Sequence, residues 1–422
     1  MIRQFWEIEE VPNTATTSTE EQRCEDHFTS THFRDNSGRF VVRLPLKENA
    51  NQMDSCRNLA IRRFFMLENR LQRNPELKAQ YVDFIREYLQ LGHCREVNVI
   101  DNIKPYYLPH HAVLRPGSSS TKCRVVFDAS AKSAPTNLSL NDVLLIGPVV
   151  QSDIVSIMLR FRLHQIVFSA DITKMYRQIN VHPDDTHKQR IYWRENPNDP
   201  LKILELLTVT YGTASAPFQA TRCLVQLANE EEATFPVAAN IIKSDCYVDD
   251  VLSGTATIDD AIEAQHQLQL MLARGGFPIH KWCSNSPELL ARIPEDEKET
   301  LKPLADRHVN NVIKVLGLLW EPITDELLIA ECAKAPTERD PPATKRIIYS
   351  EVAKHYDPLG LFAPSILLAK LLVQRLWQCK LDWNEPVDDQ TQMEWNNLKT
   401  ALPQLMQMHL MRHTEPAFTS KA

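Results

Sequence analysis

Apolar residues recur at helical spacing in two neighbouring segments near the start of the chain. The first segment carries its apolar residues at Ala60, Phe64, Leu67 and Leu71. The second begins at Asn74-Pro75, a pair typical of a helix start, and runs to Gly92, a residue typical of a helix end. Its apolar residues also share one helical face: Leu77, Tyr81, Phe84 and Tyr88. We therefore predict two adjacent helices that each bury one face.

Short apolar runs separated by turn residues predict two β-hairpins. Residues 107–114 and 122–127 flank a Pro-Gly-Ser turn and predict the first hairpin. Residues 312–320 and 327–329 flank a turn near Asp325 and predict the second.

Further helices are predicted between and after the hairpins. Thr257 and Asp260 resemble a capping pair, and Gly275 follows the helix that they would begin. Near the end of the chain, apolar positions at helical intervals predict three more helices, over residues 344–356, 365–379 and 388–402. The alternation of hairpins and helices indicates an α+β fold.

Three aspartates stand at the ends of predicted strands. Asp171 ends the apolar run 166–170, and Asp249 and Asp250 follow the short run 246–248. Strand ends and a hairpin turn can bring these carboxylates together, which is costly unless a cation lies between them. Two Mg²⁺ ions roughly 3.5–4 Å apart would neutralise them and would support nucleotidyl transfer. The alternative is structural, because aspartates are common at turns, where their side chains accept local hydrogen bonds.

A series of motifs in a fixed order resembles the reverse transcriptases of long-terminal-repeat retrotransposons, most closely the Bel/Pao group. The motifs are KCRVVFD at 122–128, DITKMYR at 171–177, YGTASAPFQ at 211–219, YVDD at 247–250, IHKW at 279–282 and VLGLLW at 315–320. With the opening Phe5-Trp6 and the late segment 356–361, the resemblance covers nearly the whole chain. It implies a right-hand polymerase with fingers, palm and thumb, in which an antiparallel palm sheet packs on helices.

The resemblance also implies a division of the chain into four parts. They are an N-terminal segment with a polar linker (1–54), N-terminal helices and fingers (55–164), the palm with part of the fingers up to a primer-grip hairpin (165–335), and a helical thumb with the start of a connection region (336–422). On the helices of the last part we expect Trp377, Trp383 and Trp395 to be buried anchors, with stacking on bases as the alternative.

The last part resembles a region catalogued as a Pao retrotransposon peptidase. An aspartic protease needs an Asp-Thr-Gly or Asp-Ser-Gly loop, and the sequence contains neither. No ribonuclease H carboxylate cluster or integrase His/Cys zinc site is recognisable, and we expect the ribonuclease H region to begin only beyond residue 422. Other parts of a Gag-Pol-type polyprotein are therefore expected as partners.

The resemblance assigns catalytic roles to a few residues. Asp171, Asp249 and Asp250, with the main-chain carbonyl of Ile172, would hold two Mg²⁺ ions, for which Mn²⁺ could substitute. Lys281 would protonate the departing pyrophosphate, a role that needs a cationic acid near the leaving group. An ordinary surface lysine is the alternative for Lys281.

The resemblance also assigns residues to the incoming nucleotide. Arg124, with Lys122, would contact the triphosphate, since a guanidinium can bind phosphate through two hydrogen bonds. Both are otherwise ordinary strand charges. Lys174 and Met175 open a short helix whose amides can hold phosphate oxygens. Tyr176 would be the steric gate against a 2′-hydroxyl, with a core tyrosine as the alternative.

Two further pairs complete the predicted site. Tyr211-Gly212 begins the template and nucleotide loop, and retroviral enzymes commonly have glutamine in place of Tyr211, so a hydrogen-bonding role of that side chain stays open. Leu316-Gly317 would form the primer grip.

Composition adds little. The net charge of −7 does not indicate a nucleic-acid partner, because nucleic-acid-binding domains usually carry a basic surface. The nine cysteines include no Cys-x-x-Cys pair, which argues against a zinc site and a disulfide framework. The sequence shows neither a membrane-spanning run nor a secretory signal, so we expect an intracellular protein, in the cytoplasm, in virus-like particles or in the nucleus.

The sequence thus predicts an RNA-directed DNA polymerase that transfers nucleotides from dNTPs to a primer 3′-hydroxyl on an RNA or DNA template. The alternative is a catalytically idle retroelement remnant that only binds nucleic acid.

Overall fold

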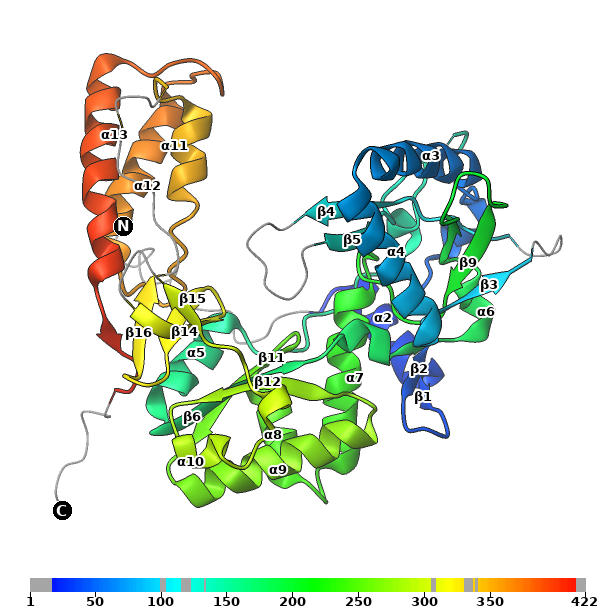
Figure 1. Cartoon of the computed structure of the whole chain (residues 1–422), viewed down its shortest axis with the longest axis horizontal. Helices are drawn as coiled ribbons and strands as arrows, with labels where there is room; N and C mark the ends of the chain where they lie inside the picture. Colours follow the sequence, from blue (N-terminus) through cyan, green and yellow to red (C-terminus); the bar gives the residue numbers. More distant parts are fainter. Residues whose placement is uncertain are drawn as a thin grey trace. The chain divides into compact units, whose positions relative to one another are not determined.

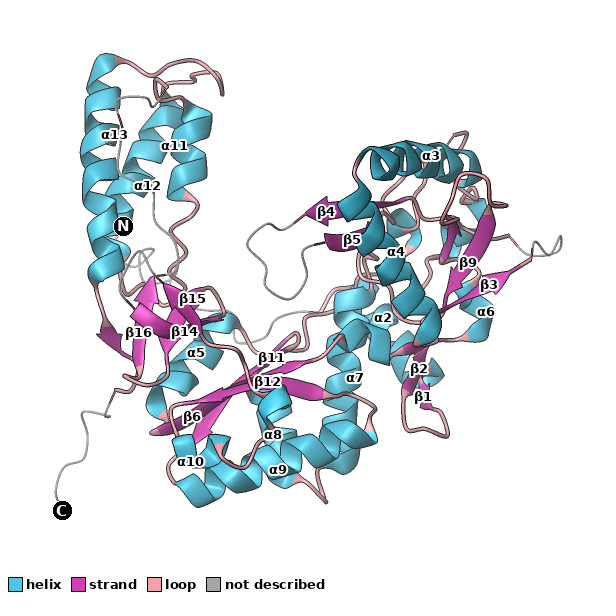
Figure 2. Cartoon of the chain, in the orientation of Figure 1, coloured by secondary structure: helices cyan, strands magenta, loops and turns pink. Residues whose placement is uncertain are grey.

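The computed structural model describes residues 17–98, 104–114, 123–132, 134–304, 309–329, 337 and 341–414. It has several small sheets and many helices (Figures 1 and 2), which confirms the predicted α+β class. The chain forms two compact units, each assembled from separate segments. Unit 1 comprises Met1–Val150, Lys174–Leu227 and Arg274–Phe277, and unit 2 comprises Gln151–Thr173, Ala228–Ala273 and Pro278–Ala422. The four parts predicted from the sequence are not tested by this division and stay a prediction.

Unit 1 contains three small sheets. The first has the strand order β1 (Phe33–Arg34), β2 (Phe40–Val42) and β7 (Asn180–Val181). The second has the order β3 (Cys94–Val97), β9 (Lys202–Leu206) and β8 (Arg190–Trp193). The third is the hairpin of β4 (His110–Leu114) and β5 (Cys123–Phe127). The hairpin predicted over 107–127 is therefore confirmed. Its turn and Lys122 lie outside the described residues, as do the first 16 residues.

The helices of unit 1 follow the apolar pattern of the sequence. They are α2 (Thr19–Thr31), α3 (Arg57–Arg73), α4 (Pro75–Gln90), α6 (Pro183–Thr186) and most of α7 (Ala216–Glu231), with the 3₁₀ turns η1 (Glu48–Gln52), η2 (Asn141–Val143) and η3 (Met175–Gln178). Helix α3 buries the four residues that the spacing predicted. Helix α4 begins where Asn74 accepts the N–H of Leu77 at 3.1 Å, and Gly92 follows it with a φ of +70°.

Unit 2 is built around a four-stranded antiparallel sheet. Its strand order is β10 (Cys246–Tyr247), β11 (Asp250–Thr255), β6 (Ile166–Ile172) and β12 (Ile279–Ser284). In the view of Figure 1, helices α8 (Pro236–Ser244) and α9 (Ile258–Arg274) lie beneath this sheet. The predicted capping residue Thr257 accepts the N–H of Asp260 at 3.3 Å at the start of α9. The predicted strand at 166–171 and the strand before Asp249 are both present.

A second sheet shares a core with the first. Its strands are β13 (Lys302–Leu304), β14 (Val309–Val315), β15 (Leu318–Glu321), β16 (Glu326–Ile329) and β17 (Leu410–Met411), and helix α10 (Pro287–Leu290) and the turn η4 (Glu295–Glu297) precede them. Helix α5 (Ile154–Leu163) supplies Phe161, which packs in one apolar cluster with Val167 of β6 and Trp320 of β15. The two sheets are therefore joined by buried side chains.

Arg412 adds a buried ion pair to this core. Its side chain is 0% exposed and contacts Asp325 through two nitrogens, each at 2.7 Å. Asp325 also accepts the indole N–H of Trp320 at 2.9 Å. The chain after β17 is thus tied to the turn before β16.

The C-terminal helices form a small bundle. They are α11 (Lys345–Val352), α12 (Ala363–Gln378), α13 (Asp389–Ala401) and the turn η6 (Leu402–Gln407). Trp395 of α13 is 2% exposed in their shared core, as predicted. Trp377 and Trp383 are 51% and 41% exposed, so the expectation that they are buried anchors was wrong. They lie at the end of α12 and in the loop after it, outside the apolar face that the bundle buries.

In the described part of the chain, no helix is long and apolar enough to span a membrane. The cysteines there are free, and only Cys379 among them is exposed.

Candidate active site

The first and third of the predicted catalytic aspartates lie opposite each other on neighbouring strands. Asp171 of β6 pairs in register with Asp250 of β11, and Asp250 pairs with Tyr247 across the β10–β11 hairpin. Because register partners in an antiparallel sheet point to the same face, the two carboxylates share one side of the sheet.

Asp249 lies in the tight turn between β10 and β11. Its carbonyl accepts the N–H of Ile172 at 2.8 Å, which joins the turn to the end of β6. Val248 adopts a φ of +58°, and its N–H donates to the side chain of Gln151 at 2.9 Å. A β-branched residue with a positive φ is strained, so the surrounding structure must hold this turn in place.

The electrostatics of Asp250 reflect this crowding. Burial raises the pKa of Asp250 to about 7, the charges of Asp249 and Asp171 act in the same direction, and the ammonium of Lys281 opposes them. A carboxyl group in this environment gains from a cation that neutralises its neighbours.

Lys281 supplies one such positive charge. Its Nζ lies 3.0 Å from Oδ2 of Asp171, and the two side chains are 48% and 22% exposed. Burial alone would lower the pKa of Lys281, but the hydrogen bond and charge of Asp171, with Glu299 and Asp250, outweigh it and raise that pKa. The lysine is therefore charged and in contact with the predicted site.

Strand β12 is irregular at Lys281. His280 pairs with Asp171, but the register shifts before Cys283, and Lys281 between them has a φ of +55°. A bulge changes the direction of a side chain relative to the regular alternation of a strand. Sequence reasoning found Lys281 by resemblance and could not have found this bulge.

A cavity of about 290 Å³ adjoins these residues in unit 2. Its lining includes Asp171, Asp250 and Glu299, and the cations Lys281, Lys302 and Lys314. Its apolar wall includes Val312, Val315 and Leu319. The cavity thus combines carboxylates, ammonium groups and an apolar surface.

The donor set suits Mg²⁺, because carboxylate oxygens are the ligands that this ion prefers. The pKa of Asp250 is raised by burial and then by the charges of Asp249 and Asp171, and a bound cation would offset both effects. In the described residues, however, the only group of three His, Cys, Asp or Glu ligand atoms within 4.8 Å of one another is Glu321, Glu326 and His409, and the three aspartates do not form such a group.

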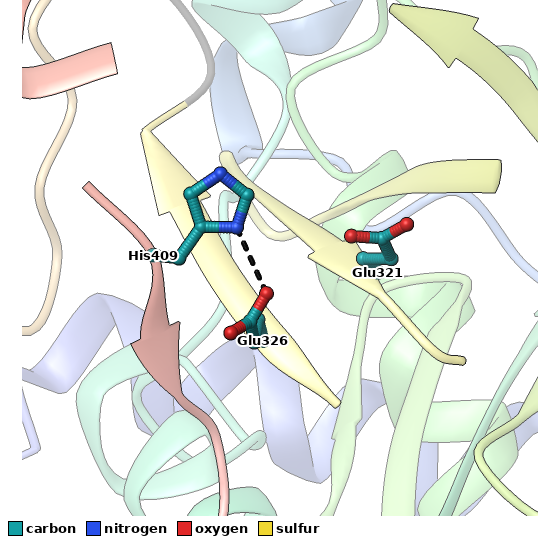
Figure 3. Close-up of side chains that lie close together, drawn as sticks. All are labelled: Glu321, Glu326 and His409. Carbon is teal, nitrogen blue, oxygen red and sulfur yellow. Dashed lines mark hydrogen bonds and ion pairs between the residues drawn. The ribbon is translucent and has the colours of Figure 1, made fainter. Parts of the chain in front are cut away.

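That other cluster lies on the second sheet and is shown in Figure 3. Nδ1 of His409 lies 2.8 Å from Glu326. The hydroxyl of Thr324 lies 3.0 Å from Glu326 and 3.2 Å from Glu321, and its one proton is shared between the two carboxylates. His409 is exposed and both glutamates are half-buried. These side chains satisfy one another, and we assign no metal to them.

The predicted nucleotide-binding residues belong to unit 1. Arg124 is exposed on β5, and its guanidinium carbon lies 5.6 Å from the centre of the Tyr211 ring. The Tyr211 hydroxyl donates to the carbonyl of Val125 at 2.9 Å. Tyr211 therefore supports Arg124 through its ring and the strand through its hydroxyl, which gives a structural role to the tyrosine that departs from the retroviral pattern.

Lys174 and Arg177 share a carboxylate that sequence reasoning missed. Both cations contact Oε1 of Glu87 on α4, Arg177 at 2.9 Å. Arg177 also lies 4.3 Å from the centre of the Tyr88 ring. Glu87 carries no signal in the sequence, because only the fold brings α4 beside the segment after Asp171.

Three cations lie near His93 in this part of unit 1. Burial lowers the pKa of His93 to about 4, and the cations Arg177, Arg39 and Lys174 lower it further, with Glu87 opposing them. Met175 is buried in η3 and Tyr176 is half-buried. Grouped cations are the environment that a phosphate group requires.

Two glycines of the predicted site have no room for a side chain. Gly212 has a φ of +101°, and a Cβ there would lie 2.4 Å from the carbonyl oxygen of Phe127. Gly317 forms the β14–β15 turn with Leu316, has a φ of +99°, and a Cβ there would lie 2.1 Å from the Tyr356 ring. Both turns therefore require glycine.

Comparison with known proteins identifies the C-terminal region. Residues 344–422 match the family described as the Pao retrotransposon-like RNaseH-like domain. The match confirms the predicted Pao-type C-terminal region, and its description names an RNaseH-like domain and not a peptidase, in agreement with the missing Asp-Thr-Gly and Asp-Ser-Gly loops. The expectation that sequence related to ribonuclease H begins only after residue 422 is wrong, since the match begins at residue 344.

No curated protein matches the chain. Among solved structures, a foamy viral protease-reverse transcriptase in complex with double-stranded DNA is similar to 75% of this chain, with 14% identity and a TM-score of 0.49. The chain spans 46% of that protein. The family match at residues 344–422 confirms the predicted resemblance to a Bel/Pao-type retroelement in the C-terminal region of the chain.

Proposed function

We propose that the chain is the RNA-directed DNA polymerase region of a Bel/Pao-type retroelement polyprotein, with fingers, palm and thumb. The observation that carries the proposal is the facing pair of Asp171 and Asp250 on adjacent strands, with Asp249 in the turn beside them. The raised pKa of Asp250, caused first by burial and then by the charges of Asp249 and Asp171, supports it, because perturbed carboxyl groups of this kind gather at functional sites.

The three aspartates, with the carbonyl of Ile172, would hold two Mg²⁺ ions, or Mn²⁺ in their place. When bound, these ions neutralise the carboxylates, activate the primer 3′-hydroxyl and stabilise charge on the reacting phosphate. Lys281 is charged and next to Asp171, and we assign it the protonation of the departing pyrophosphate.

The residues of unit 1 would bind the nucleotide. Arg124 would contact the triphosphate, with Lys122 as a second cation, and Tyr211 would hold the guanidinium in place. The main chain at Lys174 and Met175 would hold phosphate oxygens, in surroundings rich in positive charge. Tyr176 would exclude the 2′-hydroxyl.

The remaining assignments concern the nucleic acid. Gly212 would let the template and nucleotide approach the main chain, and the turn of Leu316 and Gly317 would hold the primer end. The substrates are dNTPs and a primer on an RNA or DNA template, and the partners are other parts of the polyprotein.

Primer extension on poly(rA)/oligo(dT) with Mg²⁺ tests the proposal. Asp171→Asn and Asp249→Asn should remove most turnover and leave primer-template binding nearly intact, since binding depends on backbone phosphates. Asp259→Asn, at an exposed position in the first turn of α9, is the matched control and should extend normally.

If the wild type binds primer-template but extends no primer with either Mg²⁺ or Mn²⁺, the alternative of an idle nucleic-acid-binding remnant is correct. Near-normal extension by either aspartate variant would show that the metal ligands have been wrongly assigned.

A further inference from the structure

The C-terminal helix bundle exposes three aromatic side chains together. Tyr349, Trp377 and Trp383, called the aromatic patch below, are 47%, 51% and 41% exposed. The centre of the Trp383 ring lies 5.5 Å from that of Trp377 and 6.0 Å from that of Tyr349, and both contacts are edge to face. Such grouped apolar exposure marks interaction sites more often than isolated exposed residues do.

A purely structural role explains the aromatic patch poorly. Side chains that only join helices are buried, as Trp395 is in the same bundle at 2% exposure. About half of the surface of each side chain in the patch is instead exposed, and a binding partner could cover it.

Two cations lie against these rings. Nζ of Lys345 is 3.5 Å from the centre of the Trp377 ring and 5.5 Å from that of Trp383, and the guanidinium carbon of Arg346 is 5.5 Å from that of Trp383. Neither cation forms an ion pair with any residue that the structure describes. Arg346 donates to the neutral side chain of Asn384 at 2.9 Å. Arg346 is exposed, so its positive charge is available to an anionic partner, whereas Lys345 is buried against the Trp377 ring at 5% exposure.

The main chain holds the patch in this arrangement. The N–H of Arg346 donates to the carbonyl of Trp383 at 3.0 Å, which fixes the loop to the start of α11. Glu385, an acidic residue of that loop, accepts the N–H of Asp382 at 3.2 Å and is not paired with either cation. A preformed surface loses less conformational entropy when it binds.

We propose that the aromatic patch binds single-stranded nucleic acid. Unpaired bases would stack on Trp377 and Trp383, and an adjoining phosphate would meet the exposed Arg346. This combination of aromatic faces and cations is the usual one for binding a single strand without sequence preference. A duplex hides the faces of its bases, so the partner is a strand that is not paired at this point. The proposal does not depend on polymerase activity.

Fluorescence anisotropy with short labelled oligo(dT) and oligo(rU) tests the proposal on the full chain. Trp383→Ala and Trp377→Ala should each weaken binding, by about fivefold to a hundredfold for each stacked base lost. Trp383→Phe keeps an aromatic ring and should lose less affinity. Met393→Ala removes a 60% exposed apolar side chain from α13 of the same bundle and should change nothing.

Arg346→Gln tests the charge separately and leaves the rings in place. It should lower the slope of log affinity against log salt by about 0.7, the contribution of one phosphate contact to a single strand. Duplex of the same length should bind all variants equally. Asp249→Asn should bind the single strand like the wild type even if primer extension fails for every form of the protein.

Unchanged affinity of both tryptophan variants, with wild-type melting temperatures, would overturn the proposal and leave the patch as a contact for another protein. Equal losses for single strand and duplex would also overturn it, because stacking requires unpaired bases.

Discussion

Nζ of Lys281 lies 3.0 Å from Oδ2 of Asp171. The ammonium group of Lys281 therefore lies next to a carboxylate that we assign to metal binding. A Mg²⁺ ion at Asp171 must therefore compete with Lys281 or share the carboxylate with it.

Removing the ammonium should strengthen metal binding and weaken catalysis. In Lys281→Met the half-saturating Mg²⁺ concentration should fall about two- to fivefold, the range expected for a partly exposed ion pair. Isothermal titration with Mg²⁺ measures this without any turnover, and the turnover rate should fall as the acid is lost. Lys302→Met removes another ammonium from the same cavity and serves as the control. Weaker Mg²⁺ binding in Lys281→Met would contradict the competition.

The pKa of Asp250 predicts how stability depends on pH. The pKa of Asp250 is about 7 in the folded protein, whereas its ordinary value is 3.8. The contribution of this group to stability is therefore fully present below about pH 4 and is lost as the pH rises from about 4 to about 7. The free energy of unfolding of the metal-free protein should therefore fall over this range. Urea titrations of wild type and Asp250→Asn at several pH values measure it. An equal pH dependence in both proteins would refute the assignment.

Mutating Arg124 and Tyr211 together tests whether the tyrosine positions the arginine. Arg124→Ala should raise the KM for dNTP and lower kcat. Tyr211→Ala should act in the same direction by about two- to fivefold, the size of an exposed cation–π contact, while Tyr211→Phe keeps the ring and should lose less. In the Arg124→Ala background, Tyr211→Ala should add little. Fully additive effects would mean that the two residues act independently.

Tyr176 should control the choice of sugar. It stands five residues after Asp171, and a ring there would exclude the 2′-hydroxyl by contact, whereas a merely roomy pocket rejects an added hydroxyl only about a hundredfold. Tyr176→Ala should accept UTP far better and lose modestly in deoxynucleotide extension. The measurement is the ratio of kcat/KM for dTTP over UTP, with dUTP to control for the base methyl group. If the ratio is the same in both proteins, Tyr176 is a core tyrosine.

The buried pair of Arg412 and Asp325 should matter for stability. Arg412→Met leaves the carboxylate without its main partner and should cost about 3–5 kcal/mol. Arg375→Met breaks a more exposed pair with Glu394 and should cost about 0–1 kcal/mol. Urea unfolding followed by tryptophan fluorescence compares the two variants. Similar small losses would show that Arg412 is dispensable.

Much of the local structure follows from the sequence alone. The spacing of apolar residues determined α3 and the face that it buries, and Asn74-Pro75 determined where α4 begins. The hairpin that carries Asp249 and Asp250 follows from short apolar runs on both sides of a turn. These features depend on residues within a few positions of each other, so a pattern can reveal them.

Only the tertiary structure decided which distant residues meet. Lys281 and Asp171 are 110 positions apart, and Arg412 and Asp325 are 87 apart. The exposure of Trp377 and Trp383, which sequence reasoning expected to be buried, depends on how three helices end and pack. Strand register, a bulge in β12 and the packing of the bundle set these contacts. These contacts form because the whole fold buries apolar surface, and a local sequence pattern does not predict them.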